Sequence, residues 1–91
     1  AGGTLVALSL DDRRVRRWEV PAQPGAALPD GDGVLVPCAD GAVVVRIDPS
    51  RPAVGLWRRF GRGEAPTALA RWGDGRVAVA LGGANAVAVV A

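Results

Sequence analysis

The side chains that most often carry catalysis are scarce in this sequence of 91 residues. It holds no histidine and one cysteine, Cys38, so a histidine-assisted serine or cysteine nucleophile is excluded within the chain. A single cysteine can form neither an internal disulfide nor a cysteine–histidine zinc site. We therefore expect no metal and no cofactor, and we expect Cys38 to be a small buried apolar residue.

The acidic and glycine-rich stretches do not form a recognisable site either. Asp30–Gly33 reads DGDG, as at the start of a calcium loop, but Gly41 stands at the twelfth position, where such a loop carries glutamate. No spacing pairs two carboxylates for acid–base chemistry. The segments GRGEAP and LGGANA precede no helical pattern, so phosphate binding at a helix N-terminus is not expected. Asp32 and Asp74 are interpreted as turn residues.

Charge composition argues against a nucleic-acid partner. All the positive charges are arginine, but nine acidic residues balance them to a net charge of +2, so we expect no nucleic-acid partner. In the most basic segment, RRVRRWEV, strand alternation divides the charges between two faces.

The longest uncharged run, Val77–Ala91, is 15 residues, and a membrane helix needs about 20. Arginine without lysine, beside abundant alanine, glycine, proline and valine, is typical of a GC-rich genome.

Alternating apolar and polar residues predict an all-β chain with no helix. Turn residues separate the apolar runs at intervals of roughly ten residues. Asp40–Gly41 predicts a two-residue hairpin turn with positive φ at both residues, and Asp11–Arg14 joins the first two strands. The expected strands are 4–10, 15–20, 34–39, 42–48, 53–60, 67–71, 76–81 and 86–91.

A repeat is visible in the turns. Gly-Asp-Gly occurs at 31–33 and again at 73–75, which is 42 positions later. An interval of this length with about four strands is the size of a β-propeller blade. The five residues PAQPG, which lie between Val20 and Ala26, are too few for an outer strand. The first unit is therefore expected to lack its outermost strand.

The C-terminal third carries a family resemblance. The segment GRGEAPTALARWGDGRVAVALGGANAVAVVA, residues 61–91, resembles the YVTN-type β-propeller repeat of bacterial proteins and, less closely, the NHL type. It shares a Gly and Pro before the innermost strand, an Asp-Gly turn, a VAVA-like strand and a Gly/Asn turn. The resemblance extends over 42–91 and loosely over 3–21, but the Tyr-Val-Thr-Asn tetrapeptide itself is absent. It implies a propeller fragment of about two blades, with an incomplete blade in 1–31 and, in 32–91, a second blade plus the inner hairpin of the next.

The propeller interpretation predicts which loops share the channel face. The loop before the innermost strand carries Arg62 and Glu64, and Asn85 lies in a turn of the same face, together with Asp40–Gly41 and Asp11–Arg14. We name Arg62, Glu64 and Asn85 as candidate ligand-binding residues, against the simpler interpretation that they are solvated turn residues. Trp57, in LWRRFGR, is a fourth candidate. Alternation places Trp57 and Phe60 on opposite sides of their strand.

Three functions remain open on these grounds. The first is a non-catalytic propeller module, extracytoplasmic in a bacterium, that binds a protein, glycan or small ligand on its channel face. The second is a fragment of a propeller enzyme of the lactone hydrolase or lyase type, whose catalytic residues lie in other blades. The third is a two-blade, lectin-like subunit that closes a ring by oligomerisation, with Trp57 in its sugar subsite. In each case the expected partners are adjoining blades, from the same polypeptide or from other copies of the chain.

Overall fold

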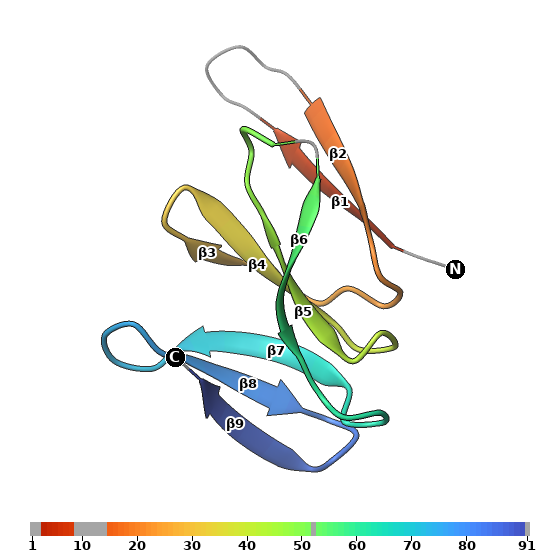
Figure 1. Ribbon diagram of the computed structural model, residues 1–91, viewed down its shortest axis with the longest axis vertical. Helices are drawn as coiled ribbons and strands as arrows, with labels where there is room; N and C mark the ends of the chain where they lie inside the picture. Colours follow the sequence, from red (N-terminus) through yellow and green to blue (C-terminus); the bar gives the residue numbers. More distant parts are fainter. Residues whose placement is uncertain (1–2, 9–14, 52, 91) are drawn as a thin grey trace.

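The described residues form three antiparallel β-sheets, which are stacked along the long axis of the molecule (Figure 1). The computed structural model describes residues 3–8, 15–51 and 53–90, and these residues are all-β, as the alternation predicts. No helix long and apolar enough to cross a membrane occurs among them. The strands are β1 (Gly3–Leu8), β2 (Val15–Val20), β3 (Leu28–Asp30), β4 (Gly33–Cys38), β5 (Val43–Ile47), β6 (Val54–Arg59), β7 (Pro66–Arg71), β8 (Val77–Leu81) and β9 (Ala86–Val90).

Each sheet is a meander of neighbouring strands. β1 pairs with β2, β3 to β6 form a four-stranded sheet in chain order, and β7 to β9 form a three-stranded sheet. Every strand expected from alternation is present, and its ends lie within one residue of the prediction, except for the C-terminal end of β1. That strand ends at Leu8, and residues 9–10 of the predicted strand lie outside the described residues. Residues 9–14, which include the expected Asp11–Arg14 turn, lie outside the described residues. The short strand β3 was not predicted as a strand, because three residues that include Pro29 carry no readable alternation.

The hairpin between β4 and β5 differs from the expected two-residue turn. The last ladder pair is Cys38 with Val43, so the loop has four residues, 39–42. Positive φ occurs at Ala42, at 52°, and at neither Asp40 nor Gly41. The loop closes when the Ala42 N–H donates to the Ala39 carbonyl at 3.2 Å, and the left-handed residue then directs the chain into β5. The prediction of a primed turn at Asp40–Gly41 was therefore wrong.

The four-stranded sheet is covered on both faces. One face packs against Trp18 and Val20 of β2, and the Trp18 indole N–H donates to the Arg51 carbonyl at 3.3 Å. The other face packs against the three-stranded sheet. Cys38 is fully buried in the first cluster, as the sequence predicted, and this burial raises the pKa of its thiol. The buried members are Trp18, Val20, Val36, Cys38, Val43, Val45 and Ile47 in the first cluster, and Leu35, Val44, Val77, Val79 and Leu81 in the second.

A β-bulge in β6 reorders its side chains. Val45 pairs with Leu56 and Val44 pairs with Arg58, so Trp57 is an extra residue on this strand. Because the alternation is interrupted there, Trp57 and Phe60 both pack against the second cluster. The prediction that they lie on opposite sides of the strand was wrong. A strict period of two cannot anticipate an inserted residue.

Two positions 42 residues apart share a backbone conformation. Gln23 and Ala65 both have positive φ, at 58° and 52°, and each stands one position before a proline that pairs with the last residue of the second strand of its sheet. Pro24 forms a bridge with Cys38, and Pro66 pairs with Leu81. Each Gly-Asp-Gly then lies in the turn that follows the first strand of its sheet. PAQPG therefore leads directly into the four-stranded sheet.

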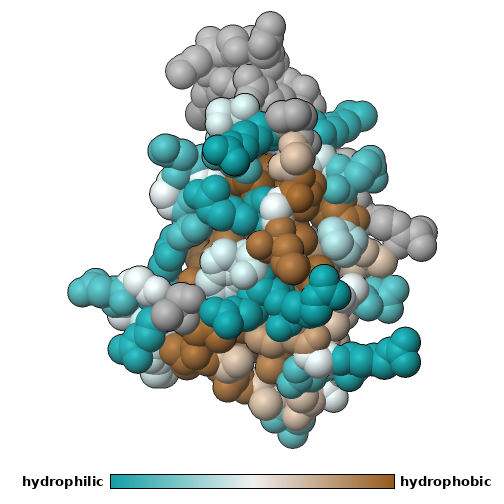
Figure 2. Space-filling view, viewed as in Figure 1, coloured by the Kyte–Doolittle hydropathy of each residue, from teal (hydrophilic) through white to brown (hydrophobic). Residues whose placement is uncertain are grey.

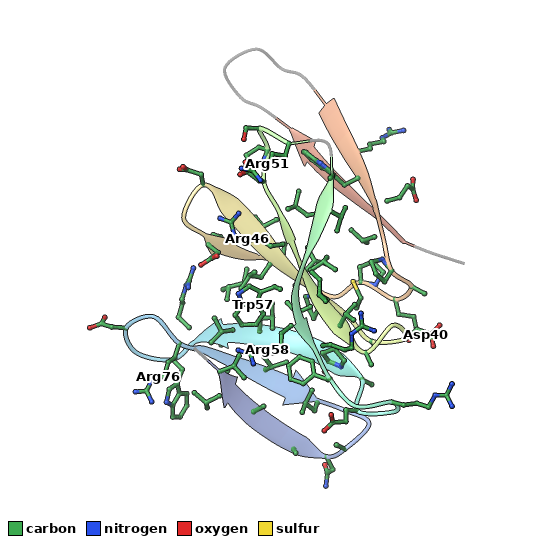
Figure 3. All side chains as sticks on the ribbon, viewed as in Figure 1. Asp40, Arg46, Arg51, Trp57, Arg58 and Arg76 are labelled. Carbon is green, nitrogen blue, oxygen red and sulfur yellow. The ribbon has the colours of Figure 1, made fainter. Side chains whose placement is uncertain are left out.

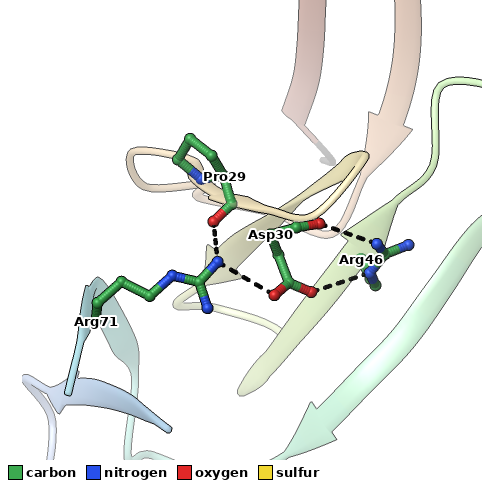
Figure 4. Close-up of polar contacts among 4 residues, drawn as sticks. All are labelled: Pro29, Asp30, Arg46 and Arg71. Atoms are coloured by element: carbon green, nitrogen blue, oxygen red, sulfur yellow. Dashed lines mark hydrogen bonds and ion pairs between the residues drawn. The ribbon is translucent and has the colours of Figure 1, made fainter. Parts of the chain in front are cut away.

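One polar cluster joins the four-stranded sheet to the three-stranded sheet at the Gly-Asp-Gly end (Figure 4). Arg46 of β5 donates from Nε to the Asp30 carboxylate at 3.1 Å and from Nη2 to the Asp30 carbonyl at 3.0 Å. Arg71 of β7 donates to the other carboxylate oxygen at 3.2 Å and to the Pro29 carbonyl. The Arg46 hydrogen bond is the largest cause that holds the pKa of Asp30 below its ordinary value. Desolvation opposes it, and the hydrogen bond from Arg71 adds to the lowering.

Asp30→Asn tests this cluster. Since the three side chains are 32–46% exposed, solvent screens the ion pairs, and we expect a loss of less than about 1 kcal/mol at pH 7. The pKa of Asp30 is lower in the folded protein than its unfolded value, near 3.8. The ionised carboxylate therefore stabilises the fold at pH values above the unfolded pKa, and this contribution is lost as the pH falls through the folded pKa. Urea unfolding at pH 7 and at about pH 2 measures both stabilities. A difference between wild type and variant that persists at the lower pH would contradict the assignment.

Candidate functional site

Three loops meet at the end of the sheets opposite to the Asp30 cluster. They are the β4–β5 loop (39–42), the β6–β7 loop (60–65) and the β8–β9 loop (82–85). The Phe60 N–H donates to the Ala42 carbonyl at 2.8 Å, and the Gly83 N–H donates to the Glu64 carbonyl at 2.9 Å. The β6–β7 loop is thus held between the other two. The structure brings together the described loops that the propeller interpretation assigned to one face.

A hollow of about 310 Å³ opens between the first two of these loops. Arg59 and Arg62 present two exposed guanidinium groups to it, and Asp40 presents one exposed carboxylate. The ring of Phe60 is half-buried and forms an apolar part of the wall. Figure 3 shows Asp40 at the opposite end of the strands from Arg46 and Arg51. The lining residues are Asp40, Gly41, Ala42, Arg59, Phe60, Arg62 and Gly63.

The chemistry of this hollow favours an anionic group. Two arginines against one aspartate leave an excess of one positive charge, and guanidinium groups bind carboxylates through paired, charge-assisted hydrogen bonds. The aspartate can accept hydrogen bonds from hydroxyl or amine groups of the same ligand. The aromatic wall adds a surface for an apolar or ring-shaped part. The arrangement can bind a polar ligand, and it offers no paired acid and base.

Glu64 has a structural role in this region. Its carboxylate accepts a hydrogen bond from the Gly61 N–H, and its own N–H donates to the Gly61 carbonyl at 3.0 Å. These two bonds close the turn that presents Arg62. Glu64 therefore positions the loop rather than facing a ligand with a free carboxylate.

Asn85 lies apart from the Arg62 hollow. It has positive φ, at 52°, a conformation that asparagine tolerates better than most residues. Its position corresponds to Ala42 in the β4–β5 loop. It lines a separate hollow of about 360 Å³ with Gly82 and Val87. The structure thus places Asn85 at the same end of the sheets as Arg62 but does not join the two in one site.

Trp57 lines a third hollow, of about 280 Å³, with Arg46, Asp48 and Arg51. Part of its ring is committed to packing against the cluster between the two larger sheets, and the Arg58 Cζ lies 5.8 Å from the ring centroid. In this hollow the Asp48 carboxylate accepts hydrogen bonds from the Ser50 N–H at 2.9 Å and the Ser50 hydroxyl at 2.7 Å, which lower the pKa of Asp48. This arrangement stabilises the turn.

Sequence reasoning missed Asp40 and Arg59 as site residues. Asp40 was placed in a turn of the predicted channel face but was not named as a candidate, and Arg59 was not named. The available signal was their register: Asp40 follows the end of β4, and Arg59 immediately precedes the loop that carries Arg62. Within residues 3–8, 15–51 and 53–90, no group of three or more potential metal ligands is found.

Searches against protein-family models, curated proteins and solved structures give no match for this chain, so its resemblance to propeller repeats stays a prediction.

Proposed function

We propose that the chain is a non-catalytic binding module in which the sheets are successive blades of a β-propeller. The ligand binds at the loop end of the sheets, in the hollow lined by Asp40, Arg59, Phe60 and Arg62. The observation that carries the proposal is the convergence, in one hollow, of two exposed guanidinium groups and an aromatic ring. Loops held at one end of a rigid sheet scaffold are the usual place for binding residues.

The ligand class follows from the side chains. A protein, glycan or small molecule that carries a carboxylate would be bound through Arg59 and Arg62, while Asp40 orients its hydroxyl or amine groups. Glu64 supports this site through the turn that it closes. Additional blades complete the propeller and supply the remaining wall of the binding face.

Arg62→Ala is expected to weaken binding of such a ligand about tenfold or more, because it removes charge-assisted hydrogen bonds worth about 1.5–3 kcal/mol. Suitable probes are glucuronate and a hexapeptide of glutamate residues, titrated while backbone amide signals are followed by NMR. Wild-type shifts should cluster at residues 40–42 and 59–63.

Arg76→Ala is the matched control for this titration. Arg76 is also exposed, and Figure 3 places it far from Asp40, at the opposite end of the sheets. It carries the same charge, so its removal changes the net charge equally and should leave affinity unchanged. Equal loss in both variants would show only non-specific attraction, and the proposal would be abandoned if neither probe perturbed the 59–63 amides.

A further inference from the structure

The three-stranded sheet has one face buried against the four-stranded sheet and one face turned outward. We call the second the outer face. It is formed by six alanine and valine residues, and none of the six is charged. Val87 is 67% exposed and Val89 is 42% exposed, and Figure 2 shows apolar atoms at the surface in the lower part of the view, where β7 to β9 lie. By strand alternation the outer face comprises Ala68, Ala70, Ala78, Ala80, Val87 and Val89.

The repeat identifies what this face corresponds to in the preceding sheet. Cys38 and Leu81 are the last ladder residues before equivalent hairpin loops. Counting back three positions from each shows that Ala78 corresponds to Leu35. Counting forward from the start of the next strand shows that Val87 corresponds to Val44.

Leu35 and Val44 are fully buried, and they form the contact of the four-stranded sheet with the sheet that follows it. Ala78 and Val87 stand at the same positions, one repeat later. The outer face therefore has the position of a sheet-packing surface, and it lacks a covering sheet in the described part of the chain.

At the Gly-Asp-Gly end of the outer face, the residues are less polar than their counterparts in the four-stranded sheet. By the same register, Trp72 corresponds to Asp30 and Val89 to Arg46. The Asp30–Arg46 pair receives Arg71 from the following sheet, whereas Trp72 is an exposed aromatic residue, 54% exposed. An arginine from a docking sheet would here lie against an indole ring, which attracts cations through its π face. A further sheet could still pack at this end of the outer face, through apolar and cation–π contacts in place of an ion pair.

At the opposite end of the stack, the exposed side of β2 carries charged residues, unlike the outer face. On β2, Trp18 and Val20 face the four-stranded sheet, while Arg17 and Glu19 are exposed on the other side. Covering the outer face with this charged surface of a second copy would desolvate both charges. The aliphatic side of a repeat sheet, which carries residues like Val77, Val79 and Leu81, matches the outer face without that cost.

We propose that the outer face is a docking surface for a further β-sheet of the same repeat, joined in series after β9. The sheet would be preceded by a strand that pairs with β9 as β6 pairs with β5. Large exposed apolar patches are rare on independent domains, and repeat units that cannot bury a face alone are stabilised by stacking. This inference rests on the blade architecture of the proposed function and does not depend on ligand binding.

A chain extended by its own repeat tests the proposal. Val90 corresponds to Ile47, so a second copy of residues 48–91 is appended directly after Val90. Val87→Asp is then introduced into the first copy of the extended chain and, separately, into the 91-residue chain. In the 91-residue chain the variant should shift Tm by less than about 2 °C, because the site is exposed. In the extended chain it should lower Tm by about 5 °C or more, because it buries a carboxylate.

Leu56→Asp is the control, since Leu56 is 56% exposed and does not belong to the outer face. It should have an equally small effect in both chains. Amide exchange of β9 gives a second readout, which should slow in the extended chain. The proposal is overturned by equal effects of Val87→Asp in the two chains, by an appended copy that unfolds beside a folded first copy, or by a 91-residue dimer that Val87→Asp converts to a monomer. None of these measurements uses a ligand, so they are independent of the binding test.

Discussion

Leu35→Ala is expected to lower the free energy of unfolding by about 2–5 kcal/mol, the usual range for truncating a buried leucine. Leu35 is fully buried and lies in the cluster between the four-stranded and three-stranded sheets. Its removal leaves a cavity in this cluster, and strands held in a ladder cannot move far to fill it. The loss should be visible in urea unfolding as a lower midpoint with an unchanged slope.

Leu56→Ala provides the matched comparison. The same atoms are removed from a leucine in the same sheet, but one that is 56% exposed, so the loss should stay within about 0.5 kcal/mol. Equal losses in the two variants would contradict the burial of Leu35 between the sheets.

Gly25→Ala is the second large expected effect, with a loss of about 1–3 kcal/mol from overpacking. A Cβ at this position would lie 2.6 Å from the Thr67 carbonyl oxygen and 3.0 Å from Pro37 Cγ. The first of these contacts is with backbone, so it cannot be relieved by a side-chain rotation. Gly25 stands just before β3 and Thr67 lies in β7, so the substitution would force apart the first strands of consecutive sheets.

Gly55→Ala separates this effect from the general cost of replacing glycine. A Cβ at Gly55 would make an ordinary contact, 3.6 Å from the Arg46 carbonyl oxygen. Alanine also has fewer conformations than glycine in the unfolded chain, so folding loses less entropy. The stability of this variant should be unchanged or rise by about 0.5–1 kcal/mol. Thermal unfolding of both variants measures the contrast, and a Gly25→Ala variant as stable as Gly55→Ala would show that the two strands do not approach closely.

The strands could be predicted from the sequence because their two faces differ in polarity or are uniformly aliphatic. The short strand β3 could not, since its pairing with β4 depends on residues 33–35 rather than on any pattern of its own. The β-bulge at Trp57 was also hidden. It arises from the register between β5 and β6, which no single segment encodes.

The site was predicted only in part. Arg62 was named from its loop, because a propeller repeat predicts which loops share an end. Asp40 and Arg59 were missed, since their proximity to Arg62 depends on how β4, β5 and β6 align. Glu64 and Asn85 were named for their polarity, but a hydrogen bond from the Gly61 N–H and a left-handed backbone give them turn-forming roles. Local sequence does not show which polar residues are used by the backbone.

The four-stranded and three-stranded sheets stack face to face, which brings their loops to one end. Methyl-to-methyl nuclear Overhauser effects measure this directly in the 91-residue chain. We expect cross-peaks from Leu35 and Val44 to Val77 and Val79, which belong to a different sheet. Cross-peaks of Leu35 and Val44 confined to their own sheet, with none to Val77 or Val79, would contradict it.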